Sequence, residues 1–542
     1  MRIVERPSGR SGFQLPELID RLLYSRGIRT EEALEEYFNP RYSKISCFTN
    51  KEMVRPVADF IRECISSGEM LAIYGDYDVD GITASAILKK TVERLGGKVM
   101  NYIPNRFEEG YGIRKEGLDK LASAGIKKAV SVDCGISSAA EAEYAVRLGI
   151  ELVITDHHEI PEILPGGLCY DPKTGSPDSA AYDLSAAGIA FFIAMDLLGH
   201  PVPDDFVKEL TALSALGTIA DIVPMTKDNR IIASLGINAI NSLYIRGIEE
   251  ILSVASVKKP VDAWHVSFVI APRLNAAGRF TTAQTAFEIF FSGDPLVTAR
   301  ALDSVNAERR ALQEEIFKHA RTAAAGETGP SIILSSPEFN RGVNGIVASK
   351  IVEEFRKPAF LFEESEGVLY GSGRSVGDID LTAVLKQCRE FFLSFGGHKM
   401  AAGARMEAAA FPAFKKKFIE TLFAMYGDIL DAEETVLVDM RAEIADFNAE
   451  VFRLMDKMAP FGTDNPKPVF FFEGVKILNG PRILKDKYKF YEASQGGVPF
   501  EICDWSGRSG FGRNDTIGVL GFPFLDNFRN RRQVKINLYK SI

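Results

Sequence analysis

Acidic and imidazole side chains recur in the first part of the chain, directly after short apolar runs. They are Asp76, Asp78, Asp80, Asp133, Asp156, His157, His158 and Asp221. A ligand set of carboxylates with one or two imidazoles and no thiolate suits Mn²⁺ or Mg²⁺ and is too oxygen-rich for structural zinc. At least four carboxylates are enough for two ions, and phosphoryl hydrolysis uses such a pair to hold the nucleophile and the leaving oxygen.

The stretch from Ile73 to Leu88, IYGDYDVDGITASAIL, has two other interpretations. An EF-hand Ca²⁺ loop starting at Asp76 would need glutamate at its twelfth position, where Ile87 stands, and a helix upstream of the loop. A solvated acidic turn would also explain this stretch alone. The apolar run instead predicts a buried strand, followed by a turn at Gly81 and a helical pattern from Thr83 to Lys90.

The elements that carry these side chains form a strand and helix alternation that begins near Lys51. Short buried strands are predicted at Leu71 to Tyr74, Lys98 to Ile103, Lys128 to Val132 and Leu152 to Ile154. Such alternation indicates βαβ units and a parallel sheet, whose function lies beyond the carboxyl ends of its strands. A further apolar stretch, Leu213 to Ala220, leads to Asp221, so four acidic ends are expected in one sheet. Solvated strand ends are the alternative for any one of them.

Length and composition indicate a multidomain globular protein. The chain has 542 residues, 46% of them hydrophobic and 25% charged, which suggests three or four domains. Its N-terminus carries charges where a signal peptide needs an apolar core, and no apolar run approaches a membrane span of roughly 18 residues. We expect a soluble cytoplasmic protein with no membrane partner. The six cysteines form no CxxC pair, which predicts free, mostly buried thiols in a reducing compartment.

Charge is distributed unevenly along the chain. The net charge is −9, yet residues 482–542 hold 11 basic against 6 acidic residues. A basic end on an acidic protein can attract phosphates locally while the remaining carboxylates bind metal. An ordinary solvated face is the alternative.

Four motifs together resemble the DHH phosphoesterase superfamily: DYDVDG at 76–81, VDCG at 132–135, DHH at 156–158 and ADIVP at 220–224. Later segments are similar to the RecJ family of single-strand DNA exonucleases in that superfamily. They are APRLNAAGR at 271–279, GVNGIVASKIVEEFRKPAFLF at 342–362, GSGRS at 371–375 and FGGHKMAAG at 395–403. The resemblance implies a 5′-to-3′ exonuclease on single-stranded DNA that depends on Mn²⁺ or Mg²⁺ and works in recombination and repair.

The resemblance also implies the roles of individual residues. The metal ligands it implies are Asp78, Asp80, Asp133, His157 and Asp221, and Asp76 and His158 complete the catalytic set nearby. Tyr74 stands where related phosphoesterases have a histidine, and Asn340 where the family often has another. We leave Tyr74 outside the ligand set.

Seven residues are candidates to hold DNA or its phosphates. They are Arg106, Tyr111, Asn275, Arg279, Ser372, Arg374 and His398. Arg106 and Tyr111 lie in a glycine-rich loop, where similar loops of the family hold the terminal nucleotide. Arg279 offers the forked donor that grips phosphate, and GSGRS offers amides, hydroxyls and a guanidinium in one predicted turn. A structural histidine is the alternative for His398.

The rest of the chain predicts further domains. The stretch between Leu296 and Ala325 keeps a helical period without glycine or proline, so a helix of about 45 Å is expected, with a coiled coil as the alternative. A small α/β unit follows from Pro330. From about Ala432, short β-rich runs with Tyr488, Phe490, Tyr491 and Trp505 resemble an OB-fold barrel that binds nucleic acid.

The expected fold is therefore an α/β multidomain chain with a parallel-sheet DHH domain, a connecting helix, a DHHA1-type domain and a C-terminal OB barrel. The expected limits are 1–50 for an N-terminal helical segment, 51–290, 291–328, 329–430 and 431–542. Two rival functions remain: a phosphodiesterase of short oligonucleotides or cyclic dinucleotides, and an inactive replication scaffold. We expect a monomer whose partners are single-stranded DNA with a 5′ end and, as candidates, a helicase and a single-strand-binding protein.

Overall fold

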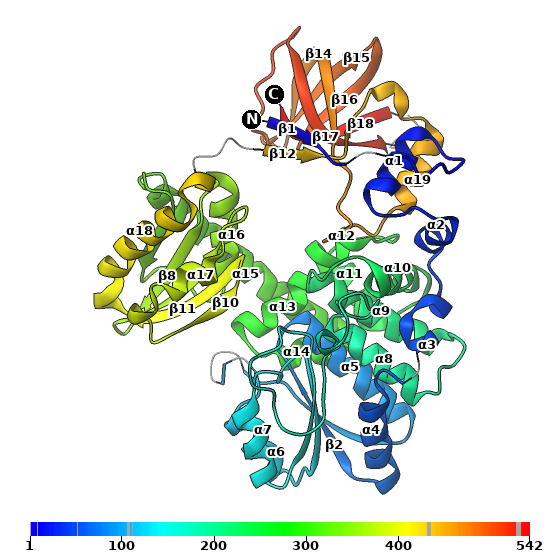
Figure 1. Cartoon of the computed structure of the whole chain (residues 1–542), viewed down its shortest axis with the longest axis vertical. Coiled ribbons are helices and arrows are strands. Elements are labelled where there is room, and N and C mark those ends of the chain that lie inside the picture. The colour runs from blue at the N-terminus through cyan, green and yellow to red at the C-terminus, as the bar shows by residue number, and fades with distance from the viewer. Residues whose placement is uncertain are drawn as a thin grey trace.

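The computed structural model describes residues 2–7, 9–50, 52–105, 109–110, 112–430, 435–526 and 533–541. It consists of a large α/β unit, a smaller α/β unit joined to it by a long helix, and a β-barrel (Figure 1). The chain starts and ends at the barrel (Figure 1). All six cysteines are free and five of them are buried, as predicted.

The large unit is built on a parallel sheet with the strand order β3-β2-β4-β5-β6. Its strands are β2 (Met70–Gly75), β3 (Lys98–Tyr102), β4 (Lys128–Val132), β5 (Glu151–Thr155) and β6 (Cys169–Tyr170). Apolar side chains of α4 (Arg55–Ser67) and α5 (Val79–Arg94) pack on one face, and those of α6 (Lys115–Ser123) and α7 (Ala139–Arg147) on the other. The four strands predicted from apolar runs are confirmed, and the predicted helix from Thr83 to Lys90 is part of the longer α5.

A helical layer completes this unit beside α5. Its helices are α8 (Ala186–Leu197), α9 (Asp205–Ala220), α10 (Lys227–Ser242), α11 (Arg246–Val254), α12 (Ala263–His265), a π-helical turn (Val266–Ile270), α13 (Ala271–Phe280) and α14 (Ala283–Glu288). All twelve residues of α8 are buried, because α4, α5 and α9 pack around it. The stretch Leu213 to Ala220 lies in α9, so the expectation that Asp221 ends a strand is wrong. Buried helices and strands are equally apolar over eight residues, and periodicity cannot separate them.

Within the described part of the chain, no single helix is long and apolar enough to cross a membrane. The bent pair α10 and α11 meets the length and composition criteria only when the two helices are taken together.

The predicted connecting helix is confirmed as α15 (Pro295–Ala324), which leads to the smaller α/β unit. That unit has the sheet order β10-β11-β9-β8-β7. Its elements are β7 (Ile332–Ser336), α16 (Asn344–Phe355), β8 (Ala359–Ser365), β9 (Val368–Arg374), α17 (Leu381–Lys386), β10 (Ser394–His398), β11 (Ala401–Glu407) and α18 (Phe411–Leu430). The prediction of a turn at GSGRS is wrong, because Gly371 to Arg374 lie in β9, and His398 lies at the end of β10.

Glycine in β9 has a packing reason. A Cβ at Gly371 or Gly373 would come within 2.3 to 2.4 Å of ring atoms of Phe362 or Phe360. The two phenylalanine rings therefore need glycines opposite them. A strand that is rich in glycine resembles a turn in composition, which explains the wrong prediction.

The barrel closes through a pairing of β14 with β17, in addition to the order β13-β14-β15-β16-β18-β17. Its elements are β12 (Thr435–Val438), β13 (Met440–Arg441), α19 (Ala449–Lys457), β14 (Phe470–Leu484), β15 (Tyr488–Gln495), β16 (Val498–Asp504), β17 (Thr516–Asp526) and β18 (Gln533–Ser541). A small closed barrel is the architecture expected of an OB-fold.

The first part of the N-terminal segment packs on this barrel, and its last part packs on the large unit, where Ile45 and Cys47 belong to the apolar core. The helices of the segment are α1 (Glu17–Ser25), α2 (Glu31–Phe38) and α3 (Ser46–Thr49), and a strand, β1 (Arg2–Glu5), pairs in parallel with β12. Ile19, Leu22 and Leu23 of α1 share one apolar core with the barrel. The expected helical segment thus contains α1, α2 and α3, and it also contains a strand, β1, that extends the C-terminal unit.

Candidate metal centre

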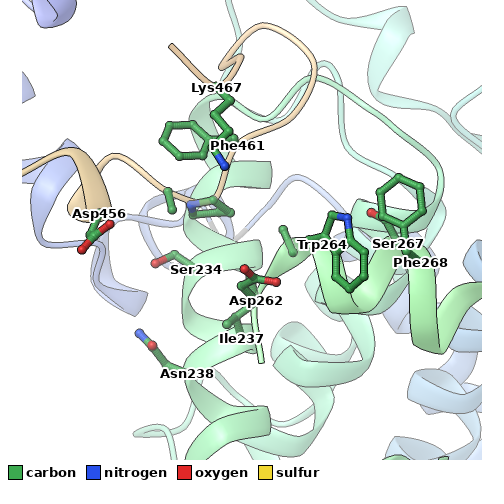
Figure 2. A pocket seen from close by; sticks show the side chains of 13 residues that line it. Ser234, Ile237, Asn238, Asp262, Trp264, Ser267, Phe268, Asp456, Phe461 and Lys467 are labelled. Atoms are coloured by element: carbon green, nitrogen blue, oxygen red, sulfur yellow. The ribbon is translucent and has the colours of Figure 1, made fainter. Parts of the chain in front are cut away.

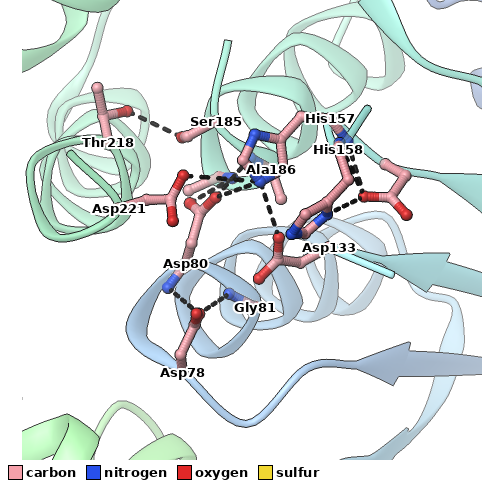
Figure 3. Close-up of polar contacts among 12 residues, drawn as sticks. Asp78, Asp80, Gly81, Asp133, His157, His158, Ser185, Ala186, Thr218 and Asp221 are labelled. Atoms are coloured by element: carbon pink, nitrogen blue, oxygen red, sulfur yellow. Dashed lines mark hydrogen bonds and ion pairs between the residues drawn. The ribbon is translucent and has the colours of Figure 1, made fainter. Parts of the chain in front are cut away.

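Acidic and imidazole side chains meet beyond the carboxyl ends of the central strands. Asp76 and Asp78 follow β2, Asp133 follows β4, and Asp156, His157 and His158 follow β5. Strands β2, β4 and β5 are neighbours in the sheet, so their ends lie side by side. Asp221 reaches the same place from the end of α9, and Figure 3 shows it with Asp80, Asp133 and His157.

Asp80 lies in the first turn of α5 and is 1% exposed. Its Oδ2 accepts a hydrogen bond from Ala186 N at 2.7 Å, and its Oδ1 accepts one from Ala187 N at 2.9 Å (Figure 3). These amides begin α8, where the helix dipole stabilises a carboxylate. Gly217 of α9 leaves room for Asp80, because a Cβ there would lie 2.4 Å from Asp80 Oδ1.

Asp78 is the N-cap of α5. Its Oδ1 accepts hydrogen bonds from Asp80 N at 2.9 Å and Gly81 N at 3.2 Å. Gly81 allows the turn from strand to helix, because a Cβ there would meet the backbone of Asp76 at 2.7 Å. The glycine that follows the three acids thus has a steric reason.

His157 stands at the centre of the cluster. Its Nε2 lies 3.1 Å from Asp133 Oδ1, 3.8 Å from Asp80 Oδ2 and 3.7 Å from Asp221 Oδ2. Burial, followed by the charge of His158, lowers its pKa to about 3. The imidazole is therefore neutral at pH 7, which is the form that binds a metal ion.

His158 is held by Asp156 instead. Its Nδ1 is 2.7 Å from Asp156 Oδ1, and Asp156 also accepts hydrogen bonds from Ile136 N and His157 N. Burial alone would lower the pKa of His158, but the hydrogen bond and charge of Asp156 raise it to about 9. His158 is thus a cation at neutral pH. Asp156 was part of the DHH motif but not of the predicted site; it orients the ring of His158 through a local contact, and the fold adds the Ile136 amide, which holds its other oxygen.

The carboxylates repel one another in the metal-free protein. Burial and the charge of Asp78 raise the pKa of Asp80 to about 7, and burial with neighbouring acids raises the pKa values of Asp133 and Asp221 well above the ordinary range. A buried cluster of this kind is relieved by bound cations, because a metal replaces the missing solvation and balances the charge.

Potential ligand atoms meet in three overlapping groups, and the two groups that lack the cationic His158 could each hold a metal ion. The three groups are Asp80 with His157 and Asp221, Asp76 with Asp78 and Asp133, and Asp133 with His157 and His158. Potential ligand atoms within each group lie within 4.8 Å of one another. The donor set of carboxylates and imidazole fits Mn²⁺ or Mg²⁺, and Asp133 stands in both a carboxylate group and an imidazole group.

Tyr74 is directed away from the carboxylates. It is completely buried beside Tyr102, and its hydroxyl contacts the backbone of Gly112 and Arg114. The residue that replaces the histidine of related enzymes therefore has a packing role. Asn340 accepts a hydrogen bond from Gly342 N at 2.8 Å, so this side chain shapes the turn before α16.

The predicted phosphate ligands fall into two places. Arg279 donates to Gly342 O at 3.0 Å, and the Arg374 guanidinium lies against Gly345, so both arginines approach the start of α16. Ser372 is half-buried in β9. Asn275 lies in α13 and accepts from Val79 N at 3.1 Å, directly behind the Asp78 turn. Arg106 and Tyr111 lie outside the described residues.

His398 contributes to a cavity between the two α/β units. The cavity has a volume of about 410 Å³ and is lined by Arg114, Ser138, Asp156, His158, Glu159 and His398, among others. His398 is exposed and faces the His158 side of the metal centre, which argues against a structural histidine. Arg114 and Ser138 were not predicted, because their sequence neighbourhood resembles an ordinary connection.

Comparisons with known proteins agree with this arrangement. The family models described as DHH family, N-terminal domain, DHHA1 domain and RecJ OB domain match residues 70–218, 329–424 and 438–540. The single-stranded-DNA-specific exonuclease RecJ of Escherichia coli is 31% identical over 90% of this chain and 88% of its own length. RecJ of Bacillus subtilis is 33% identical over 88% of this chain, which spans 61% of that longer protein.

A solved structure shows the same architecture. The crystal structure of RecJ from Thermus thermophilus in complex with Mn²⁺ has a TM-score of 0.85 and 27% identity. The match covers 100% of this chain and 79% of that one. The whole domain order described above is therefore present in that protein.

Proposed function

This chain belongs to the RecJ family of single-stranded-DNA-specific exonucleases, and on that premise we propose that it degrades single-stranded DNA from the 5′ end with two divalent ions. The observation that carries the proposal is the set of overlapping carboxylate and imidazole groups at the strand ends. Mn²⁺ or Mg²⁺ fits their donor atoms, and the Thermus relative is a Mn²⁺ complex.

The residues that would hold the ions are Asp78, Asp80, Asp133, His157 and Asp221, with Asp76 completing the second group. When bound, the ions would lower the pKa of a water molecule and neutralise charge on the scissile phosphate. His158 holds a positive charge at the cavity wall, where a phosphate would enter, and Asp156 keeps its ring in that orientation. No described side chain is needed as a covalent nucleophile in this scheme.

The 5′-to-3′ direction of degradation would be set by a site for the terminal phosphate at the smaller α/β unit. Arg279 and Arg374 approach one backbone segment, Gly342 to Gly345, from two different units. Forked guanidinium donors suit a terminal phosphate, and Ser372, His398 and Asn275 would hold the adjoining nucleotides. Arg106 and Tyr111 remain predictions for the terminal nucleotide.

The barrel would bind the part of the single-stranded DNA that has not yet reached the metal centre. Trp505 is 48% exposed and packs edge-on against Tyr488 and Phe490, whereas Tyr491 is completely buried. Exposed aromatics in a basic barrel suit base stacking, so Trp505 and Tyr488 are the proposed platform and Tyr491 is core. This barrel favours a long single strand over a dinucleotide substrate. The inactive scaffold is disfavoured, because all five proposed ligands are present.

Cellular context is part of the proposal. We place the enzyme in the cytoplasm as a monomer in DNA recombination and repair, fed by a helicase and a single-strand-binding protein. The domain limits predicted from the sequence are kept as predictions, and within residues 1–50 the helices α1 and α2 share the core of the barrel whereas Ile45 and Cys47 belong to the core of the large unit.

The test is an exonuclease assay on an end-labelled single strand with and without a 5′-phosphate. With Mn²⁺ or Mg²⁺, the wild type should shorten the strand stepwise from the 5′ end and should leave a dinucleotide largely intact. Asp80→Ala should abolish cleavage while retaining most of the affinity for the strand. Cleavage by the purified variant in Mn²⁺, or degradation from the 3′ end, would refute the assignment.

A further inference from the structure

The loop that carries Asp221 has an unusual backbone. It joins α9 to α10 over residues 221–226, and Ile222 directly after the ligand has a φ of 61°. A β-branched residue rarely adopts this conformation, and its side chain is 71% exposed. Such strain persists only where surrounding contacts hold the backbone, and it concentrates at functional sites.

Those contacts come from a residue 241 positions later, Thr463. Its Oγ1 donates a hydrogen bond to Ile222 O at 3.0 Å, and its carbonyl accepts one from Met225 N at 2.7 Å. Met225 is buried, and Gly462 lies so close that a Cβ there would be 3.1 Å from Met225 Cβ. Thr463 thus binds the ligand loop at two points, on both sides of Val223 and Pro224.

The segment that carries Thr463 is itself well braced. Gly462 and Asn465 form a reciprocal pair of backbone hydrogen bonds at 3.0 and 3.2 Å. The side chain of Asn465 is buried, donates to Pro460 O at 2.8 Å and accepts from the hydroxyl of Tyr37 at 2.9 Å. Thr463 is therefore presented by a loop whose shape is defined by its own contacts.

A buried arginine joins this segment to the metal-bearing unit. Arg230 of α10 donates to the carbonyls of Tyr37, Met458 and Ala459, and its guanidinium lies 3.8 Å over the Tyr37 ring. Figure 2 shows the chain from Asp456 to Lys467 running alongside α10. Seven residues after Thr463 this chain becomes β14, the first long strand of the barrel.

We propose that Thr463 is a positioning residue of the metal centre: it holds the Asp221 loop so that the carboxylate stays beside His157, and thereby couples the barrel to metal binding. The inference rests on the proposed role of Asp221 as a metal ligand.

The experiment compares full-length variants by Mn²⁺ titration in the absence of DNA, using calorimetry and the electron paramagnetic resonance signal of free Mn²⁺. Thr463→Val keeps the side-chain shape and removes the hydroxyl, and it should weaken one of the two Mn²⁺ sites about tenfold, as loss of outer-shell support does. Thr463→Ser should restore the wild-type affinity. Thr322→Val removes a comparable hydroxyl, bonded to Lys318 O within α15, and should bind Mn²⁺ as the wild type does.

Hydrogen exchange provides a second measurement. Mn²⁺ should slow exchange of the Met225 amide in the wild type, and this protection should be smaller in Thr463→Val. Asp221→Asn separates the two hypotheses. If Asp221→Asn binds both ions normally, the ligand assignment of the proposed function fails. If Asp221→Asn loses an ion while Thr463→Val keeps wild-type Mn²⁺ affinity and Met225 protection, the positioning role of Thr463 is refuted.

Discussion

Asp80→Asn removes one ionisable group from the metal centre while keeping its size. In the metal-free protein, burial and the charge of Asp78 raise the pKa of this carboxyl from 3.8 to about 7. The folded chain therefore binds a proton at Asp80 between about pH 4 and pH 7 that the unfolded chain releases. Because the folded state binds more protons in that window, the free energy of unfolding falls as pH rises.

The size of the effect follows from the displacement of the pKa. A rise from 3.8 to about 7 corresponds to at most about 4 kcal/mol of stability lost by the time Asp80 is fully ionised. Asparagine does not titrate. It accepts weaker hydrogen bonds from Ala186 N and Ala187 N than a carboxylate does, and this loss lowers the stability of the variant by the same amount at every pH. The stability of the wild type relative to Asp80→Asn should thus decrease between pH 4 and pH 7.

The assay is urea unfolding in EDTA, with pulse deuterium labelling read on peptides from α8. All twelve residues of this helix are buried, so it reports on unfolding of the metal-bearing unit alone. His157 contributes the opposite slope, because its pKa of about 3 makes the folded state bind fewer protons up to pH 6.5. Both proteins retain this histidine, so the difference between them reports the titration of Asp80 together with the rise that the charge of Asp80 causes in the pKa values of Asp133 and Asp221.

Addition of Mn²⁺ should reverse the trend in the wild type. Bound ions hold Asp80 ionised, so stabilisation by Mn²⁺ should grow as pH rises from 5 to 8, and it should be smaller in Asp80→Asn, which keeps the group of Asp76, Asp78 and Asp133. If the free energy of unfolding of the wild type, relative to that of Asp80→Asn, stays constant or rises from pH 4 to pH 7 in EDTA, the assignment of a raised pKa to Asp80 is refuted.

Three further predictions concern residues outside the ligand set. Tyr74→Phe should bind the same number of Mn²⁺ ions as the wild type in calorimetry, because the hydroxyl contacts the 112–114 backbone; loss of an ion would place Tyr74 in the site. Arg230→Met should destabilise the metal-bearing unit by about 3 kcal/mol in urea, because backbone carbonyls lose a buried donor; an unchanged midpoint would exclude this anchor. Trp505→Ala should weaken binding of a long single strand about tenfold in fluorescence anisotropy without changing Mn²⁺ affinity, and equal binding would exclude stacking there.

Much of the metal centre could be predicted from residue types and spacing. Asp78, Asp133 and His157 follow three apolar runs, and parallel strands place their carboxyl ends at one edge of a sheet. That geometric rule makes acids far apart in sequence meet without knowledge of packing. The long helix α15 was predictable for a similar reason, because a local period over 30 residues defines it.

Other features depended on tertiary packing. Asp221 follows a helix, α9, and not a strand. Because α9 is buried on nearly all sides, the stretch before Asp221 is apolar throughout, and eight apolar residues do not distinguish a helix from a strand. Gly371 to Arg374 form a strand between β8 and β11, and its glycines are needed because the rings of Phe360 and Phe362 lie opposite them.

The sequence by itself therefore determined which atoms could bind the metal ions and which end of the sheet they occupy, since strand periodicity and chain direction are local properties. Only the tertiary structure decided what supports those atoms. The contacts of the α8 amides with Asp80, of the Ile136 amide with Asp156 and of Thr463 with the Asp221 loop join residues that are 20 to 241 positions apart. Such contacts arise when separate elements pack, and no local pattern in the chain records them.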